Sequence, residues 1–417
     1  MTRSALRAAT VAVLWLGPTG AMAGDDWPQW RGPNRDGVSH ETGLLQSWPE
    51  DGPPLAFQVE GLGAGYSTVA IASGRIHTLG MNSRREWVLA FDSRTGKSLW
   101  ATPHGPGYRD GRGDGPRSVP TVVDGTVYVL GAQGRLSALR ADTGQLLWSV
   151  DLFAEVGGRN ISWGISESPL VLDDRVLVSP GGRRAGFAAF DRTTGEELWR
   201  SEGDEAGYAS PITVDFSGAV HAVFFSGDRA AGIHPKSGAL LWEYSGASNR
   251  TANIATPILV SESADAARLF FSSDYGTGAA LVELRAAPDG RIHAEEQYFT
   301  RQMRAHHATP VLVDGVLYGF SGSILTALDI ETGATFWRDR AVRKGSLTYA
   351  DGRLYIFSER GDVVLAEPSR AGYIEHGRFE FPAEDRSRRA TWSHPVVANG
   401  RLYLRDQDTL VAYDISR

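Results

Sequence analysis

A short motif recurs along this chain at a regular spacing, and it constrains the fold more than any other feature. The first copy runs from Ala90 to Trp100 and reads Ala-Phe-Asp-Ser-Arg-Thr-Gly-Lys-Ser-Leu-Trp. Four more copies end at Trp148, Trp199, Trp242 and Trp337. Successive tryptophans of the motif lie between 43 and 95 residues apart. The longest gap equals two periods, and residues 284–290 keep the turn of a copy that has lost its tryptophan. Fainter copies occur at residues 366–372 and 412–414.

Each copy has the pattern of a strand, a tight turn and a second strand. Apolar and polar residues alternate, Asp and Thr can hydrogen-bond to the turn backbone, and Gly supplies a positive φ. A period of about 40 to 50 residues with several short strands is typical of a β-propeller, in which each repeat is one blade. We expect each tryptophan to pack against the neighbouring blade.

The repeat predicts an all-β fold, an eight-bladed propeller of four-stranded antiparallel blades. Eight first strands are expected to begin near residues 67, 118, 168, 210, 256, 309, 346 and 393. The last blade stops at Asp414, one strand short, and an unpartnered strand is predicted from Leu55 to Glu60. This N-terminal strand should complete the eighth blade and close the ring, which removes two open sheet edges.

The first 23 residues have the pattern of a cleavable signal peptide. Arg3 and Arg7 precede an apolar run over residues 8–16, and Ala21-Met22-Ala23 offers a small-x-small cleavage site. The apolar run is too short to span a bilayer. We therefore expect a periplasmic or secreted protein, with residues 24–417 forming one propeller domain and residues 24–60 serving as an N-terminal clasp and closing strand.

Composition limits the partners and the covalent chemistry. The formal net charge is −7 and there is no cysteine, so disulfides and lipid attachment at a cysteine are excluded, and an acidic surface disfavours nucleic acid and anionic lipid. We expect a monomer without membrane insertion. Its partner would be an envelope or extracellular protein, or a small-molecule ligand.

The two ends of the ring differ in their sequences. Asp-Gly and Asn-Gly turns, such as Asp124-Gly125 and Asn399-Gly400, and the Thr-Gly turns of the motif should lie together at one stereotyped end. The longer connections at the opposite end lead into the innermost strands and are individual, so we expect any site there. The candidate ligand-binding residues of this loop-rich face are Arg117, Trp163, Glu167, Tyr208, His306, His307, Lys344, Trp392, His394 and Arg405.

Each candidate also has a structural interpretation. Adjacent His306 and His307 should point to opposite faces of extended chain, which disfavours a shared metal, and no metal site is predicted. Trp163, Tyr208 and Trp392 could stack on a flat ligand or cap the core, and Glu167 is a possible general base. Cationic Arg117, Lys344 and Arg405 could hold an anion or pair with acids.

Two further segments have similar alternatives. Trp27, Trp30 and Arg31 lie in a rigid Trp-, Pro- and Gly-containing segment, which is either a clasp over an apolar surface or part of a ligand site. Arg112-Gly113-Asp114 is similar to an adhesion tripeptide, a pattern with little information.

With these residues in view, the chain resembles the pyrroloquinoline-quinone-type repeat propellers. The Ala-x-Asp-x-x-Thr-Gly-x-x-x-Trp unit is similar to the tryptophan-docking motif of quinoprotein alcohol dehydrogenases. The superfamily also includes the non-catalytic lipoprotein of the outer-membrane β-barrel assembly machinery. Exported propellers with quinone-binding-like repeats share the opening Trp27 to Pro33, residues 344–346 and 358–361, and the ending Trp392 to Pro395 with residues 402–406.

The resemblance implies two classes of function. The first is a non-catalytic binding or scaffold module for a protein, peptide or small ligand, with no cofactor firmly assigned. The alternative is an oxidoreductase that uses pyrroloquinoline quinone with calcium, with Trp163 or Trp392 as stacking platform and Glu167 or Asp114 as base. The chain lacks the adjacent cysteines that cover the quinone in many such enzymes, and the lipidated cysteine of the assembly lipoprotein.

A lyase or hydrolase on the propeller is a third possibility. All enzyme hypotheses require a carboxylate or histidine that converges with an aromatic residue at the channel mouth. The binding hypothesis predicts a broad exposed patch.

Overall fold

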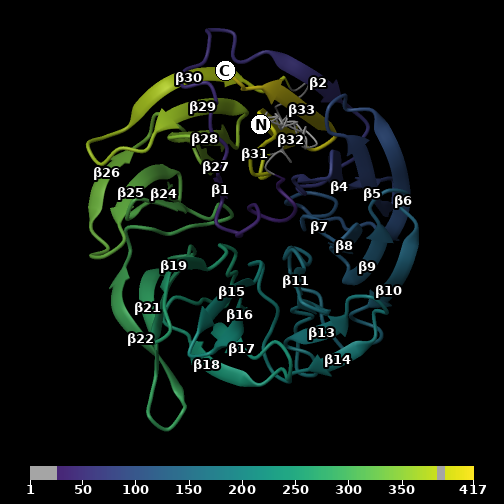
Figure 1. Cartoon of the computed structure of the whole chain (residues 1–417), viewed down its shortest axis with the longest axis vertical. Coiled ribbons are helices and arrows are strands. Elements are labelled where there is room, and N and C mark those ends of the chain that lie inside the picture. The colour runs from purple at the N-terminus through teal and green to yellow at the C-terminus, as the bar shows by residue number, and fades with distance from the viewer. Residues whose placement is uncertain (1–25, 383–389) are drawn as a thin grey trace, which may run out of the picture.

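The computed structural model describes residues 26–382 and 390–417, which form a ring of eight four-stranded antiparallel blades (Figure 1). One blade gains a fifth strand, β1 (Val38–Ser39), which pairs with it in parallel. The signal peptide predicted for residues 1–23 lies outside the described residues. Over the described ranges the regular structure is all strand, and no helix is long and apolar enough to cross a membrane. The predicted eight-bladed propeller is confirmed.

Each blade runs from an innermost to an outermost strand in chain order. Blades one to four contain β3 (Ala70–Ala72), β4 (Arg75–Asn82), β5 (Arg85–Asp92) and β6 (Ser98–Pro106); β7 (Thr121–Val123), β8 (Thr126–Leu130), β9 (Arg135–Arg140) and β10 (Leu146–Asp151); β11 (Leu170–Leu172), β12 (Arg175–Val178), β13 (Ala188–Asp191) and β14 (Glu197–Arg200); and β15 (Ile212–Phe216), β16 (Ala219–Phe225), β17 (Ala230–Ile233) and β18 (Leu240–Tyr244).

Blades five to seven repeat this plan, and the eighth takes one strand from the N-terminal part. They contain β19 (Ile258–Glu262), β20 (Ala266–Ser273), β21 (Gly278–Ala286) and β22 (Ile292–Thr300); β23 (Val311–Val313), β24 (Val316–Ser321), β25 (Ile324–Asp329) and β26 (Thr335–Asp339); β27 (Gly345–Ala350), β28 (Arg353–Ser358), β29 (Asp362–Glu367) and β30 (Ile374–Glu380); and β31 (Val396–Ala398), β32 (Arg401–Asp406), β33 (Thr409–Asp414) and β2 (Leu55–Val59).

The N-terminal strand closes the ring as expected. Strand β2 pairs antiparallel with β33, with Phe57 opposite Ala412 and Val59 opposite Leu410. The first and last parts of the chain therefore share one sheet, and the ring is closed by backbone hydrogen bonds rather than by a disulfide.

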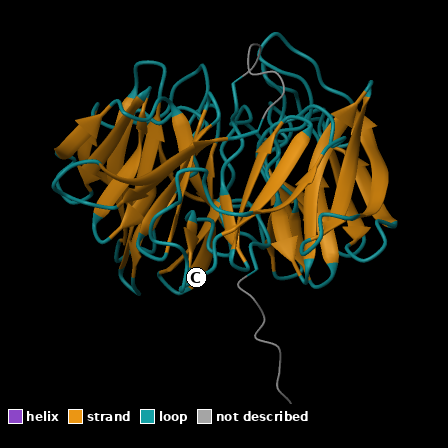
Figure 2. Cartoon of the chain, turned by 90° about the horizontal axis from the view of Figure 1, so that it is seen from above, coloured by secondary structure: helices purple, strands orange, loops and turns teal. Residues whose placement is uncertain are grey.

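The two short turns of a blade lie at the same end of the ring, as the sequence predicts. The amide of Ala141, in the Thr-Gly turn of blade two, donates a hydrogen bond to the carbonyl of Gly125 in the first turn of that blade. The same contact joins Ser93 to Gly74 in blade one. The strands therefore run between one face built from stereotyped turns and one face with individual loops (Figure 2).

The motif tryptophans hold each blade to the next. The indole N–H groups of Trp100, Trp148, Trp199 and Trp337 donate to carbonyls of the following blade at 3.1, 2.9, 2.8 and 2.7 Å. In blade five, Tyr298 takes this role, and its hydroxyl donates to the Ile330 carbonyl at 2.7 Å. Trp242 differs, because its indole N–H donates to His221 of its own blade.

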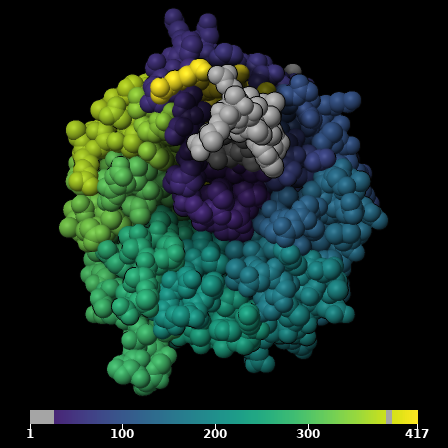
Figure 3. Space-filling view, viewed as in Figure 1, coloured from purple at the N-terminus to yellow at the C-terminus, as the bar shows by residue number. Residues whose placement is uncertain are grey.

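Residues 26–41, which we call the plug, occupy the centre of the ring and contact all eight blades. The plug is the purple segment in the middle of Figure 3. Backbone hydrogen bonds join it to Ile71 and Val122 in blades one and two. At its far end, β1 (Val38–Ser39) runs parallel to β27 in blade seven, and the Glu41 carboxylate accepts the amides of Asn399 and Gly400 in blade eight.

Two buried arginines and one tryptophan connect the plug to the remaining blades. Arg35 donates to the carbonyls of Ser168, Pro169 and Pro211 in blades three and four. Arg31 donates to the carbonyls of Thr309 and Pro310 in blade six, and the indole N–H of Trp30 donates to the Thr256 hydroxyl in blade five. This segment, expected to be a clasp over an apolar surface or part of a ligand site, thus lies in the channel and is hydrogen-bonded to the blades around it.

Candidate binding site

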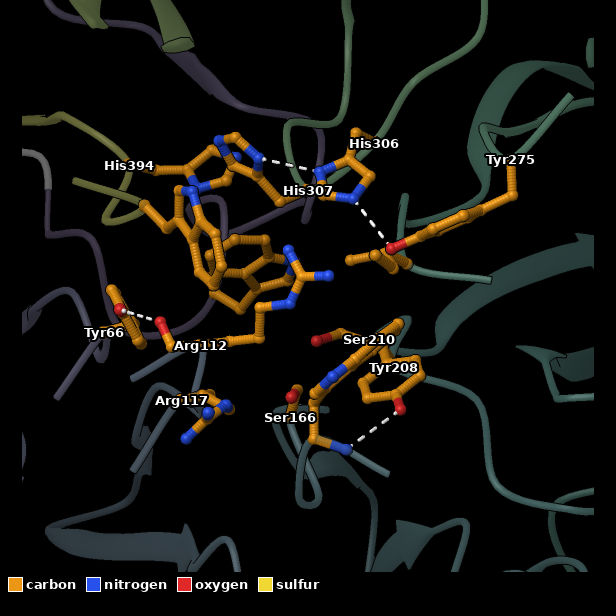
Figure 4. Close-up of a pocket in the computed structure, with 14 residues that line it drawn as sticks. Tyr66, Arg112, Arg117, Ser166, Tyr208, Ser210, Tyr275, His306, His307 and His394 are labelled. Atoms are coloured by element: carbon orange, nitrogen blue, oxygen red, sulfur yellow. Dashed lines mark hydrogen bonds between the residues drawn. The ribbon is translucent and has the colours of Figure 1, made fainter. Parts of the chain in front are cut away.

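A pocket of about 140 Å³ lies on the loop-rich side of the plug. Most of its lining residues come from the connections that lead into the innermost strands, and Trp30 of the plug also lines it. The lining is dominated by rings, with a few polar side chains: Trp30, Tyr66, Trp163, Tyr208, Tyr275, His306, His307, Trp392 and His394, then Arg112, Arg117, Ser166, Ser210 and Ile254 (Figure 4).

One wall of the pocket is a continuous group of rings around Trp392. The ring of Tyr66 lies 4.8 Å from that of Trp392, and the ring of His307 lies 5.6 Å from it. The ring centres of Trp30 and His394 lie 4.5 Å apart in an edge arrangement. Because Trp30 belongs to the plug, the N-terminal segment contributes part of this wall.

The opposite wall is built around Trp163. Tyr275 is stacked on it, with ring centres 6.2 Å apart and planes at 17°, and Tyr208 lies 5.7 Å away. The Tyr208 hydroxyl accepts the backbone N–H of Trp163. The Arg112 guanidinium lies 6.0 Å over the Trp163 ring. These rings and those around Trp392 line the same pocket, which therefore offers several aromatic faces to a flat ring.

A hydrogen-bonded chain runs behind these walls. The Tyr275 hydroxyl and Nε2 of His306 are 2.9 Å apart, and Nδ1 of His306 lies 2.9 Å from Nζ of Lys344. Nζ of Lys344 in turn lies 3.3 Å from the Glu359 carboxylate, which also accepts the indole N–H of Trp392 at 2.8 Å. The chain fixes ring positions on both walls, so the pocket is pre-formed.

The three histidines of the pocket are neutral at pH 7. Burial and the nearby Lys344 lower the pKa of His306 to about 4. Burial and Arg31 lower the pKa of His394 to about 3, and burial, Lys344 and the other histidines hold the pKa of His307 well below its ordinary value. Nε2 of His307 is buried without a partner among the described residues, so a bound water can satisfy it.

The two arginines of the pocket differ in their freedom. Arg117 is held by its own loop, because its guanidinium donates to Gly113, Gly115 and Asp110 and lies 4.8 Å over Tyr108. The exposed guanidinium of Arg112 forms no hydrogen bond or ion pair with the described part of the chain. Arg112 is therefore the cation available to an anionic group at the pocket.

Seven of the ten predicted residues meet in this pocket: Arg117, Trp163, Tyr208, His306, His307, Trp392 and His394. Lys344 stands behind the wall, bonded to His306 and Glu359. The adjacent histidines correct one expectation. They do not point to opposite faces, because the chain bends at this point instead of remaining extended, and their Nδ1 atoms are 3.3 Å apart.

Two predicted residues have structural positions instead. Glu167 is buried away from the pocket, where it accepts the amide of Ser179 and lies near Arg35 of the plug; burial raises its pKa to about 8. Arg405 is fully buried between blades eight and one, where it donates to Ser67, Thr78 and Leu79. The prediction that Glu167 and Arg405 lie at the channel mouth is wrong. Both side chains are buried, and their partners are buried backbone groups of the blades.

Several pocket residues were not among the candidates. Trp30, for which the sequence leaves a clasp and a ligand group open, belongs to the plug and also lines the pocket. Arg112 belongs to the tripeptide that carries little information. Tyr66 lies in the connection that leads into β3, a position that signals the channel mouth. Tyr275 lies in the turn between β20 and β21, and only the arrangement of the blades brings it to Trp163.

The described residues do not fit the quinone and calcium pair. The calcium ion in the dehydrogenases that the chain resembles is held by carboxylates and an amide, and no Asp, Glu, Asn or Gln lines this pocket over the described ranges. Residues 26–382 and 390–417 also contain no group of three His, Asp or Glu side chains that could hold a metal ion. The proposed base Asp114 does not line the pocket, and Glu167 lies away from it.

Fold and site together define an eight-bladed propeller with a plugged channel and an aromatic pocket on its loop-rich face. The chain belongs to the family described as outer membrane protein assembly factor BamB, whose model matches residues 84–339 and 321–417. It is 25% identical over 330 residues to the BamB of Yersinia pestis, a match that covers 74% of this chain and 76% of that protein.

The chain is also similar to quinoprotein dehydrogenases. It is 34% identical over 141 residues to the quinohemoprotein alcohol dehydrogenase ADH-IIG of Pseudomonas putida, covering 32% of this chain and only 19% of the dehydrogenase. Among solved structures, BamB from Moraxella catarrhalis aligns with a TM-score of 0.60 at 15% identity over 87% of this chain and 99% of that chain. The quinohemoprotein alcohol dehydrogenase of Comamonas testosteroni aligns with a TM-score of 0.63 at 15% identity, over 94% of this chain and 81% of that chain. These structures share the fold.

Proposed function

We propose that this chain is a non-catalytic binding protein of the bacterial cell envelope that holds a flat ring in its aromatic pocket. The observation that carries the proposal is the convergence of Trp163, Tyr275, Tyr208, Tyr66 and Trp392 from five connections onto one pocket. The ring can belong to a small ligand or to a side chain of a protein partner. The family relationship to an outer membrane assembly factor supports an envelope location.

The binding hypothesis predicts a broad exposed patch, whereas the site in the described part of the chain is a small pocket in which histidines lie beside aromatic rings. That arrangement meets the condition set for an enzyme. We nevertheless favour binding, because the histidines are neutral with strongly lowered pKa values and Glu359 is occupied by Lys344 and Trp392. Nδ1 of His307 lies 3.7 Å from the Glu359 carboxylate, but that carboxylate is also held by Lys344. Weak bases of this kind are poorly matched to proton transfer at pH 7.

Thermal shift and calorimetric titration test the proposal. N-acetyltryptophanamide, a neutral flat-ring probe, should stabilise the protein saturably, since a ligand that binds only the folded state raises the melting temperature. Trp392→Ala and Trp163→Ala should abolish the shift. Phe336→Ala on outer strand β26 is the matched control and should retain it. No stabilisation by excess probe in the wild-type protein would contradict the proposal.

The same assay separates the oxidoreductase alternative. Pyrroloquinoline quinone is titrated with and without calcium. Stabilisation that needs calcium would favour the alternative and overturn the non-catalytic assignment. Quinone binding that is indifferent to calcium and lost in Trp163→Ala would identify the quinone as one more flat ring in the pocket.

A further inference from the structure

A second cavity adjoins the aromatic pocket on the loop-rich face. This groove has a volume of about 330 Å³, and Tyr208 lines both cavities. Two loops also pass from one to the other. Ser162 lines the groove and Trp163 the pocket, while Asn253 lines the groove and Ile254 the pocket. The two cavities therefore lie side by side on this face and share Tyr208 as a wall residue.

The groove is polar and contains both signs of charge. Arg159 and Arg250 line it from two different loops, and both are exposed. Within the described ranges, neither guanidinium forms an ion pair or a hydrogen bond. Glu205 and Asp228 line the same groove and are also exposed. The groove thus offers two free cations together with carboxylate acceptors.

The amide side chains of the groove are already in use. The side-chain N–H groups of Asn160 donate to the Ala132 carbonyl and to Gln133, and those of Asn253 donate to the carbonyls of Ser226 and Asn249. These bonds hold the two loops in place. One carboxylate oxygen of Asp228 also accepts the backbone amide of Glu205, at 2.8 Å. Within the described ranges, the two arginines, the Glu205 carboxylate and the second Asp228 oxygen remain for a ligand.

We propose that the pocket and groove form one site for an acidic peptide segment that carries an aromatic residue, with the ring in the pocket and acidic side chains between Arg159 and Arg250. The inference rests on the proposed function of the pocket. A peptide suits this pair of cavities because its backbone N–H groups can meet Glu205 and Asp228 while its carboxylates meet the arginines. A simple polyanion would be repelled by those two acids.

Arg112 extends the same charge pattern to the pocket. It is a free cation at the aromatic end, and the described pocket lining contains no carboxylate to oppose it. Arg112, Arg159 and Arg250 thus place three cations without an ion pair among the described residues on one face of a chain with a net charge of −7, with Glu205 and Asp228 beside two of them. Such charge complementarity steers and orients an acidic partner.

The direct test uses fluorescence anisotropy with labelled, end-capped peptides and the full-length protein. The probe Gly-Trp-Gly-Ser-Glu-Glu-Gly places its first acid about 10 Å along an extended chain from the tryptophan. Its partners replace both Glu by Gln, or Trp by Ala. We expect the Gln peptide to bind about three- to ten-fold more weakly, as for partly exposed ion pairs, and more so at low salt. The Ala peptide should lose binding.

Protein variants assign the effect to the groove. Arg159→Ala with Arg250→Ala should reduce affinity for the Glu peptide to that for the Gln peptide and leave the Gln peptide unchanged. Arg343→Ala is the matched control, since Arg343 is also exposed but lines neither cavity. Equal binding of the Glu and Gln peptides, or an intact preference in the double variant, would overturn the inference.

The outcomes also separate this inference from the proposed function. If N-acetyltryptophanamide binds as tightly as the Glu peptide, the pocket binds rings and the groove plays no part, so the inference fails and the proposed function stands. If neither that probe nor any peptide binds in a manner sensitive to Trp392→Ala, both fail.

Discussion

Gly195 lies directly against the indole of Trp148, so close that a Cβ atom at this glycine would meet the ring at 2.7 Å. The two residues come from successive copies of the motif, one in the turn of blade three and one in the outer strand of blade two. The same relationship joins Gly144 to Trp100, Gly238 to Trp199 and Gly333 to Tyr298. The glycine of each of these turns thus contacts the aromatic ring of the preceding blade, and its missing side chain leaves room for that ring.

Gly195→Ala should therefore destabilise the fold in two ways. Its φ of +76° is strained for any side chain, at about 1–2 kcal/mol, and the clash with Trp148 adds about 1–3 kcal/mol. Gly352→Ala is the control, because Gly352 has the same φ with nothing within 4 Å. Urea denaturation should show a clearly larger loss for Gly195→Ala. Equal losses in the free energy of unfolding for the two variants would mean that the Trp148 ring does not pack against Gly195.

Trp199→Ala should loosen blade three from blade four. The indole N–H donates to the Pro235 carbonyl, and the ring packs on Gly238. Because the ring is only half buried, we expect a loss near the lower end of the about 3–5 kcal/mol typical of such truncations. Calorimetry would record this as a fall of several degrees in melting temperature. An unchanged melting temperature would show that docking contributes nothing at this blade.

Deletion of residues 25–60 should prevent the ring from closing. It removes the plug, which contacts all eight blades, and β2, which completes blade eight. The deletion leaves the edge of β33 without its partner, and an open edge favours aggregation. Size-exclusion chromatography and calorimetry should find aggregates without a cooperative transition. Shortening the exposed hairpin tip at residues 287–290 should be harmless, and a soluble, cooperatively melting deletion would refute the closure mechanism.

Glu167 should make stability depend on pH between 6.5 and 8. Its pKa is raised from 4.5 to about 8, so the folded state keeps a proton that the unfolded state releases, and stability falls as the pH rises through this window. Buried histidines such as His306 and His394, whose pKa values are lowered from 6.5, act in the opposite direction, but only below pH 6.5.

Glu167→Gln should therefore remove the fall of a few kcal/mol in the free energy of unfolding that the wild-type protein shows across this range. Urea denaturation at several pH values measures it. If the free energy of unfolding changed with pH in the same way in the wild-type protein and in Glu167→Gln, Glu167 would not titrate in this window. Glu359→Gln is a useful comparison, because this carboxylate is only partly buried and paired with Lys344.

The repeat architecture could be predicted from the amino-acid sequence. Strand alternation, the Asp, Thr and Gly of the turn and the tryptophan that ends the motif are local features, and they recur most fully in blades one, two, three and six. The missing last strand and the spare segment at Leu55 likewise predict closure, because sheet edges must pair. The copy at residues 284–290, which lacks the tryptophan, can also be placed from the sequence. The sequence does not reveal that Tyr298 takes the role of that tryptophan.

Only the tertiary structure decided which side chains form the site. Lys344, Arg405 and Arg117 look alike in sequence, yet one supports a wall, one is buried between blades and one is held by its own loop. Trp30 and Tyr275 reach the pocket because the plug and a distant turn are brought to the channel mouth. Loop side chains have no period that sets their direction, so contacts between blades far apart in sequence determine where each one points.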